Sequence, residues 1–429
     1  MKHRTESGLE KKVEGGGNVR ADIPADTIRK NMLWNVIGST GFIGAQWAMT
    51  ILIVHLAGYA EAGYLSLGLS LTNIFTNIAY FCIRNYQVSD LSGKYDEDIY
   101  VTHRVVMTGA ALALYLLFVL CNGYGVYVTV FLLLFMVYRL GEPVVDVFHG
   151  IDQKAWRLDV AGKSFLLRAI LTLLSFIVLE KLTGNLAVTT AVMLVAVYGV
   201  IFLYDIPQAY RFASFSLRFD KGALLSLTKE CFPLFVYAIC LNMVVPIPRY
   251  VLEKVAGSEM LGYYASVAIP ASVIQLFASY IFTTFTALFS EYVARNEKKK
   301  FLSLFGKLTI VIVALVAAAL GGCALLGEWV LVLVFTETIR PYVYLLMPTV
   351  FCCGIIALIW FMGNVLTVLR DRKGLLLGAA AGTAAVIGVS YPCIIQWGMD
   401  GINVALLVSS MTTLVIFGVR FAAFMRRWK

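Results

Sequence analysis

The stretch Tyr124–Phe148, YGVYVTVFLLLFMVYRLGEPVVDVF, decides the fold of this chain. A helix needs about 20 apolar residues to cross the roughly 30 Å hydrocarbon core of a bilayer, and this stretch is longer than that. It also carries Arg139, Glu142 and Asp146, whose charges are costly in hydrocarbon. The stretch therefore predicts a membrane-spanning helix with one polar face that lies against protein or water.

Similar apolar stretches fill most of the remaining chain, which is 60% hydrophobic and only 14% charged. We predict an all-α polytopic membrane protein of about twelve transmembrane helices. The predicted spans are Met32–Leu56, Tyr64–Ile83, Val105–Cys121, Tyr124–Phe148, Phe165–Leu179, Leu186–Tyr204, Cys231–Leu252, Leu261–Phe289, Leu308–Leu326, Val343–Val368, Leu375–Trp397 and Ile402–Val419.

Lysine and arginine residues alternate between the two sides of this arrangement. Of the 35 in the chain, 29 fall in the two tails and in every second loop, which we place in the cytoplasm. Both termini are then cytoplasmic, and the protein is a multi-pass protein of a bacterial-type cell (inner) membrane. The net charge of +9 lies mostly at the inner leaflet, where it attracts anionic lipid headgroups, so we expect no nucleic-acid partner.

The loops also suggest a division into domains. We predict a cytoplasmic tail over residues 1–31, an N-lobe over 32–205, a cytoplasmic linker over 206–230 and a C-lobe over 231–429. Each lobe has six helices, and carriers built from two such halves bind substrate in a central cavity between them.

Several classes of function are disfavoured by what the sequence lacks. Its eight cysteines and four histidines show neither CxxC nor Cys/His ligand spacing, so no metal site is predicted. The chain has no GxxxxGK[ST] phosphate loop, and the acidic residues of the predicted external loops are dispersed singly. We expect a carrier without a cofactor and not an enzyme, with H+ or Na+ as the candidate coupling cation.

The charges of the fourth predicted span leave two interpretations open. Arg139, Glu142 and Asp146 lie at positions i, i+3 and i+7 and share one helix face, where Arg139 can pair with Glu142. The face could form a buried ion-pair network, or it could line a water-filled cavity that contacts substrate or ions. Under the second interpretation, Glu142 and Asp146 are candidates for ion coupling.

Three further arginines lie within or at the ends of predicted spans: Arg84, Arg168 and Arg249. Each could extend its side chain to the lipid headgroups. Alternatively, each could bind a phosphate or diphosphate, for which a guanidinium offers forked donors that are always charged.

Two sets of short motifs carry a resemblance to a known family. The first is RNYQVSD at Arg84–Asp90, followed by Gly93, Lys94 and Tyr95; the second is IPRYVL at Ile247–Leu252, followed by GYY at Gly262–Tyr264, with Ile269 and Pro270 after it. With these motifs the chain resembles the Wzx-type polysaccharide flippases of the multidrug/oligosaccharidyl-lipid/polysaccharide (MOP) exporter superfamily. Span number, loop lengths and the boundary between the halves extend the similarity over nearly the whole chain.

The resemblance implies two six-helix lobes around a cationic cavity that opens alternately to each side. The implied substrate is an undecaprenyl-diphosphate-linked oligosaccharide, flipped to the outer leaflet for polysaccharide biosynthesis, with a polymerase and assembly proteins as partners. Arg84 and Arg249 are the arginines of the matched motifs, and Arg139 and Arg168 join them as substrate-binding candidates because they lie within spans. A multidrug or cation antiporter of the same fold and a membrane glycan polymerase or glycosyltransferase remain as alternatives.

Overall fold

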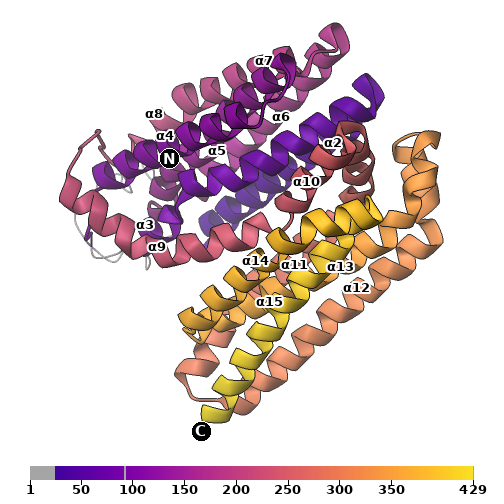
Figure 1. Ribbon diagram of the computed structural model, residues 1–429. Coiled ribbons are helices and arrows are strands. Elements are labelled where there is room, and N and C mark those ends of the chain that lie inside the picture. Colours follow the sequence, from indigo (N-terminus) through magenta and orange to yellow (C-terminus); the bar gives the residue numbers. More distant parts are fainter. Residues whose placement is uncertain (1–24, 91–92, 429) are drawn as a thin grey trace. The chain divides into compact units, whose positions relative to one another are not determined.

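The computed structural model describes residues 25–90 and 93–428, most of which lie in helices (Figure 1). Within these ranges there is no strand, so the predicted all-α fold is confirmed. Most of the predicted tail over residues 1–31 lies outside the described residues.

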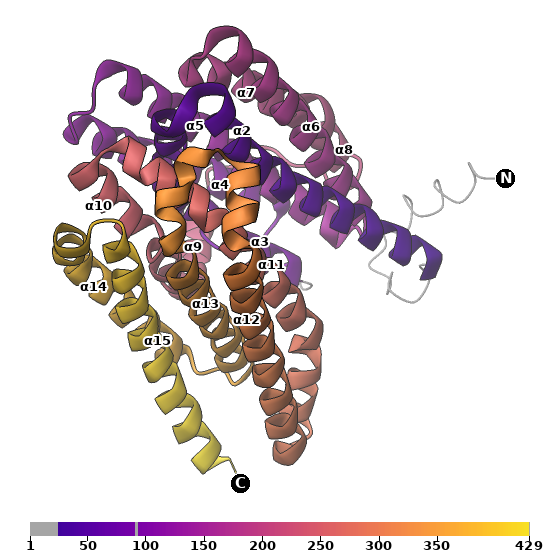
Figure 2. The same cartoon turned by 90° about the vertical axis from the view of Figure 1, so that its right-hand side faces the viewer.

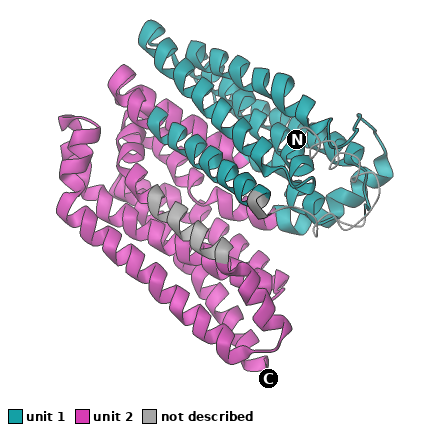
Figure 3. Ribbon diagram, turned by 180° about the vertical axis from the view of Figure 1, so that it is seen from behind, with its two compact units in different colours: residues 1–49, 75–235 teal, residues 50–74, 236–429 magenta. Residues whose placement is uncertain are grey.

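The chain divides into two compact units, shown in different colours in Figure 3. Their boundaries fall inside two helices, α2 (Ala25–Tyr80) and α9 (Lys221–Met243), and not in loops. The lobe and linker boundaries that we derived from the loops stay a prediction. Unit 1 comprises residues 1–49 and 75–235, and unit 2 comprises residues 50–74 and 236–429.

Helix α2 contains the first predicted span and all of the second except its last three residues, and the two are separated by a sharp break at Gly58. The backbone there has φ of 87° and ψ of −178°, a conformation that costs a residue with a side chain much more than it costs glycine. The 56-residue segment is therefore two helices in series, as the spacing of the apolar residues predicted.

Unit 1 is organised around α5 (Val126–Lys154), the helix that holds the opening stretch of the sequence. It packs against α4 (Glu97–Cys121), α6 (Leu158–Thr183) and α7 (Leu186–Val200), and the four helices lie together in Figure 1. Over its most apolar window, 56% of α5 is buried in protein, against 22% of α4. More of α5 than of α4 is thus covered by other helices. The remaining elements of unit 1 are α3 (Ile83–Ser89), the π-helix η3 (Ile201–Asp205) and α8 (Ile206–Ala209).

Small residues let helices of unit 1 approach closely. A Cβ atom placed on Gly38 of α2 would lie 1.9 Å from the carbonyl oxygen of Gly162 on α6, a distance that no side chain can occupy. Such close packing of backbones is how helices associate in lipid, where no hydrophobic force draws them together.

Unit 2 is built around two groups of helices. Figure 2 shows α11, α12 and α13 side by side and α14 beside α15, and each of these pairs of neighbours is in contact. Phenylalanines such as Phe289, Phe301 and Phe361 fill its core. The elements are α10 (Pro246–Ala256), α11 (Ser258–Ala294), α12 (Lys298–Val334), the 3-10 helix η4 (Glu337–Leu345), α13 (Leu346–Val368), α14 (Arg372–Trp397) and α15 (Asp400–Arg427).

The outer surfaces of these helices suit a bilayer. Nine helical stretches of the described chain are long and apolar enough to cross a membrane. They hold all the predicted spans except Phe165–Leu179 and Leu261–Phe289, which lie in α6 and α11. Only 11% of the apolar window of α12 is buried within the protein, so most of its hydrophobic surface needs lipid to cover it. The chain is a multi-pass membrane protein; the placement of its termini in the cytoplasm stays a prediction.

Candidate functional site

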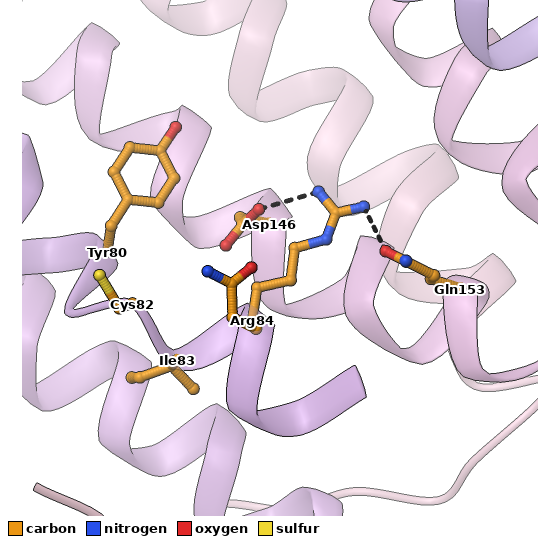
Figure 4. Close-up of a pocket in the computed structure, with 7 residues that line it drawn as sticks. Tyr80, Cys82, Ile83, Arg84, Asp146 and Gln153 are labelled. Carbon is orange, nitrogen blue, oxygen red and sulfur yellow. Dashed lines mark hydrogen bonds and ion pairs between the residues drawn. The ribbon is translucent and has the colours of Figure 1, made fainter. Parts of the chain in front are cut away.

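A polar pocket of about 410 Å³ opens in unit 1 where α2, α3 and α5 meet (Figure 4). Its volume is within the range of pockets that bind small ligands or headgroups. The lining residues are Tyr80, Cys82, Ile83, Arg84, Asn85, Asp146 and Gln153.

The chain enters the pocket through a sharp turn between α2 and α3. Phe81 and Cys82 have φ of 44° and 56°, in the left-handed region that residues with side chains rarely adopt. The Phe81 ring stacks on Phe235, with ring centroids 4.3 Å apart, and helps to hold this conformation. Because of the turn, α3 lies against α5 and directs Arg84 toward it, as Figure 4 shows.

Asp146 of α5 lies at the centre of the site and pairs with two arginines. Nη1 of Arg84 is 3.0 Å from one carboxylate oxygen, and Nη2 of Arg104 is 2.8 Å from the other. The two guanidiniums contribute one more positive charge than the carboxylate can neutralise. This part of the pocket therefore favours an anionic ligand.

The two arginines are held very differently. Arg104 is 1% exposed and donates further hydrogen bonds of 2.7 and 2.8 Å to the carbonyl oxygens of Ala79 and Tyr80 at the end of α2. Arg84 is 25% exposed, and its second donor reaches the side-chain oxygen of Gln153 at 3.0 Å. Arg104 is thus a fixed counter-ion of Asp146, whereas Arg84 can turn toward a ligand.

Arg104 was not among the predicted site residues. It lies directly before the predicted span Val105–Cys121, as one of the loop charges on which the predicted orientation rests. An arginine directly before an apolar stretch can instead extend its side chain into the protein. The position of Arg104 at the start of the predicted span was the one feature of the sequence that could have indicated this role.

Glu142 and Arg168 form a second ion pair in unit 1. Nη1 of Arg168 is 2.5 Å from the Glu142 carboxylate, and the Arg168 side chain is fully buried. Its guanidinium also lies over the rings of Phe42 and Phe165, with centroids 5.3 and 5.1 Å away. Arg168 is therefore enclosed between α5, α6 and α2 and does not reach outward to lipid headgroups.

Arg139 is half-buried on α5, one turn before Glu142. Its charge acts on Tyr80, at the end of α2, as do the charges of Glu142 and Asp146. Of the residues predicted on α5, Asp146 lines the pocket, while Glu142 joins the pair with Arg168.

Arg249 lies in unit 2, on α10. It is half-buried, and its guanidinium lies over the ring of Tyr264, 6.0 Å from the centroid. Within the described part of the chain it has no carboxylate within ion-pair distance, and its Nε has no hydrogen-bond partner. Arg249 is thus a cation of unit 2 with no direct neutralising partner among the described residues.

Two other residues of the RNYQVSD motif, Gln87 and Asp90, have structural roles. Gln87 is fully buried and donates to the Glu97 carboxylate at 2.7 Å and to the carbonyl oxygen of Val147 at 3.2 Å. Asp90 accepts hydrogen bonds from the backbone nitrogens of Lys94 and Tyr95 at 3.0 and 3.1 Å. These contacts fix α3 against α4 and α5, while Arg84 and Asn85 are the motif residues that line the pocket.

Lys94 connects this loop to α9. Its Nζ is 2.5 Å from the Glu230 carboxylate, and this hydrogen bond raises the pKa of Lys94 above its ordinary value. The pair is exposed, so it contributes little to stability.

The second motif set also packs within unit 2. Tyr263 stacks between Tyr59 and Tyr342, with ring centroids 4.0 and 4.1 Å away. The Tyr264 hydroxyl donates to the side-chain oxygen of Asn403 at 3.0 Å. Tyr264, over which the Arg249 guanidinium lies, is therefore held in place by this hydrogen bond.

Comparison with known proteins gives one curated relative and several solved structures. No family model matches the chain. The capsular polysaccharide biosynthesis protein CapF of Staphylococcus aureus is 24% identical over 295 residues, which cover 68% of this chain and 73% of the relative.

Among solved structures, an inward-facing multidrug resistance MATE family transporter of the MOP superfamily matches with a TM-score of 0.71 at 10% identity, over 90% of this chain and 94% of the other. The lipid II flippase MurJ, in an inward closed conformation, matches with a TM-score of 0.68 at 12% identity, over 91% of this chain and 87% of the other. The predicted resemblance is confirmed at the level of the fold: the chain folds as the transporters of the MOP superfamily do.

Proposed function

We propose that the protein is a flippase that moves a polyprenyl-diphosphate-linked oligosaccharide across the cell membrane for polysaccharide biosynthesis. The observation that carries the proposal is the Arg84–Asp146–Arg104 group, which presents a surplus positive charge in a pocket of a membrane protein. The likeness to a capsular polysaccharide biosynthesis protein and to the fold of a lipid II flippase supports it.

Substrate binding in this proposal is an exchange of partners at Arg84. A diphosphate entering the pocket takes the forked donors of Arg84, while Asp146 keeps its bond to the buried Arg104. No buried charge is left unpaired in the exchange, which keeps its energetic cost low. Arg104 acts as a positioning residue, and Arg84 is the residue that touches the substrate.

Arg249 supplies a further cation, which lies in unit 2. Arg139 on α5 and Arg168 on α6 stay candidates for substrate binding because they are charged residues within membrane-spanning helices. Alternating access requires two bodies that move against each other, and the division into two compact units is compatible with that requirement. The polyprenyl chain can stay in lipid while only the diphosphate and sugars pass through the protein.

A multidrug or cation antiporter is the second candidate. The pocket disfavours it, since Asp146 is shared by two arginines and Glu142 is paired with Arg168, which leaves a cationic drug facing a surplus of positive charge. Glu142 and Asp146 stay candidates for coupling to H+ or Na+, but each would have to exchange an arginine for the ion. The polymerase or glycosyltransferase alternative gains no support from this pocket. Its one carboxylate, Asp146, is paired with two arginines and is not available as an acid or base.

The test is mass spectrometry of the lipid that co-purifies with the protein. Charge-assisted hydrogen bonds are worth about 1.5–3 kcal/mol, so Arg84→Ala should reduce the bound diphosphate lipid about 10- to 100-fold. Arg84→Lys, which keeps the charge but not the fork, should bind an intermediate amount. Arg218→Ala is the matched control, because Arg218 pairs with Asp96 at the surface, where its side chain is 56% exposed.

The result that would contradict the proposal is full retention of the diphosphate lipid in Arg84→Ala, Arg139→Ala and Arg249→Ala at normal expression. In cells, loss of the protein should leave the diphosphate-linked glycan in the cytoplasmic leaflet. Normal glycan display together with altered dye efflux would favour the antiporter instead.

A further inference from the structure

A second group of titratable side chains lies in unit 1 and takes no part in the pocket. Nε2 of His149 on α5 is 3.4 Å from the Asp205 carboxylate, and both side chains are buried, with exposures of 1% and 0%. Asp205 is the last residue of η3. Such π-helical turns are rare and occur often at functional sites.

Asp152 lies one turn after His149 on α5 and is fully buried. Neither of its carboxylate oxygens has a hydrogen-bond partner among the described residues, and one oxygen of Asp205 also lacks one. An ionised carboxylate without partners is very unfavourable in a buried site. Asp152 must therefore be uncharged or bind a cation.

The charged and titratable groups around Asp152 come from every helix packed against it. Asp205 and Tyr204 belong to η3. Arg157 and Asp159 lie at the start of α6, and Arg84 lies on α3. The charge of Arg168, on α6, acts on His149. The three arginines already have carboxylate partners, namely Asp159, Asp146 and Glu142. Asp159 is neutralised by Arg157 at 2.9 Å and Lys163 at 3.1 Å.

The carboxyl groups of Asp152 and Asp205 and the imidazole of His149 therefore have no other charged group available to neutralise them among the described residues. A protonated His149 can neutralise Asp205, but nothing then remains for Asp152. With a neutral imidazole, both carboxyl groups would have to be neutral. In either case one proton stays on Asp152. A metal ion is a poor alternative, since no group of three or more suitable ligands occurs among the described residues.

We propose that His149, Asp152 and Asp205 form a proton-binding site in unit 1, separate from the Arg84 pocket, in which Asp152 holds the proton. Release of this proton puts two negative charges close together beside the π-helical turn and favours a different arrangement of that turn. The proposal does not depend on which substrate the protein carries.

Infrared difference spectroscopy of the purified full-length protein tests the site directly. At neutral pH the protein should show the carbonyl stretch of a protonated carboxylic acid, and a step to alkaline pH should replace it with carboxylate bands. Asp152→Asn should lose this change. Asp159→Asn is the matched control, since Asp159 is already paired with two cations and should contribute no acid band.

A second variant keeps the test decisive if Asp152→Asn fails to fold. Asp152→Glu keeps a carboxyl group in the cluster and should give the same pH-dependent change at a shifted frequency. The proposal is overturned if the parent lacks the acid band, if Asp152→Asn keeps it, or if Asp152→Glu leaves its frequency unchanged. Replacement of the band by carboxylate on adding Na+ at constant pH would also overturn it, because Asp152 would then bind a metal cation and not a proton.

Discussion

The Arg168–Glu142 pair allows a direct test of whether Arg168 supports the fold or contacts substrate. Arg168→Met removes a guanidinium that is fully buried and 2.5 Å from the Glu142 carboxylate. Glu142, whose side chain is 14% exposed, is then left as a nearly buried charge without its partner. Loss of one partner from a buried pair costs about 3–5 kcal/mol of the free energy of unfolding.

The double variant Arg168→Met/Glu142→Gln removes both charges together. Neutral side chains of similar volume often replace a buried ion pair with little loss of stability. We therefore expect the double variant to recover at least about 2 kcal/mol of the loss seen in Arg168→Met, a coupling within the range measured for residues in contact. The exposed pair Arg218–Asp96 serves as the control, and its removal should cost about 0–1 kcal/mol.

The assay is reversible denaturation of the purified protein in mixed micelles, with the free energy of unfolding extrapolated to zero denaturant. A cost below about 1 kcal/mol for Arg168→Met, or a double variant whose loss equals the sum of the two single losses, would refute the reasoning. Bound lipid is the second readout. If the double variant is stable but has lost the diphosphate lipid, Arg168 contacts substrate; if it binds lipid normally, Arg168 is structural.

Two further predictions concern packing and pH. Gly38→Leu should prevent stable folding because its side chain would enter the Gly162 backbone, whereas Gly44→Leu, with nothing within 4 Å of its Cβ position, should have little effect; the yield of monodisperse protein checks both. Arg420 donates two hydrogen bonds to Asp371, at 2.8 and 2.6 Å, and holds the pKa of that carboxyl below its ordinary value. Its stabilisation is therefore complete above the unfolded pKa of about 3.9 and is lost as the pH falls below it; a thermal melting series from neutral to acidic pH should show this loss in the parent and not in Asp371→Asn.

Sequence patterns predicted the helices well because each span is a local property. A run of apolar residues long enough to cross the bilayer must form a helix, since lipid offers its backbone no other hydrogen-bond partners. The break at Gly58 lies between the first two predicted spans, where the apolar stretch is interrupted. The i, i+3, i+7 spacing of Arg139, Glu142 and Asp146 likewise indicated that the face of α5 is not exposed to lipid.

The partners on that face were decided only by the tertiary structure. Asp146 pairs with arginines 62 and 42 residues away, and Glu142 pairs with one 26 residues further along the chain. Helix periodicity states which residues share a face, but not which neighbouring helix approaches it or at what height. For the same reason, Arg104 could be interpreted only as a loop charge until the fold placed it beside Asp146. Asp152 likewise became a candidate proton-binding residue only because the fold buries its carboxyl group without a hydrogen-bond partner among the described residues.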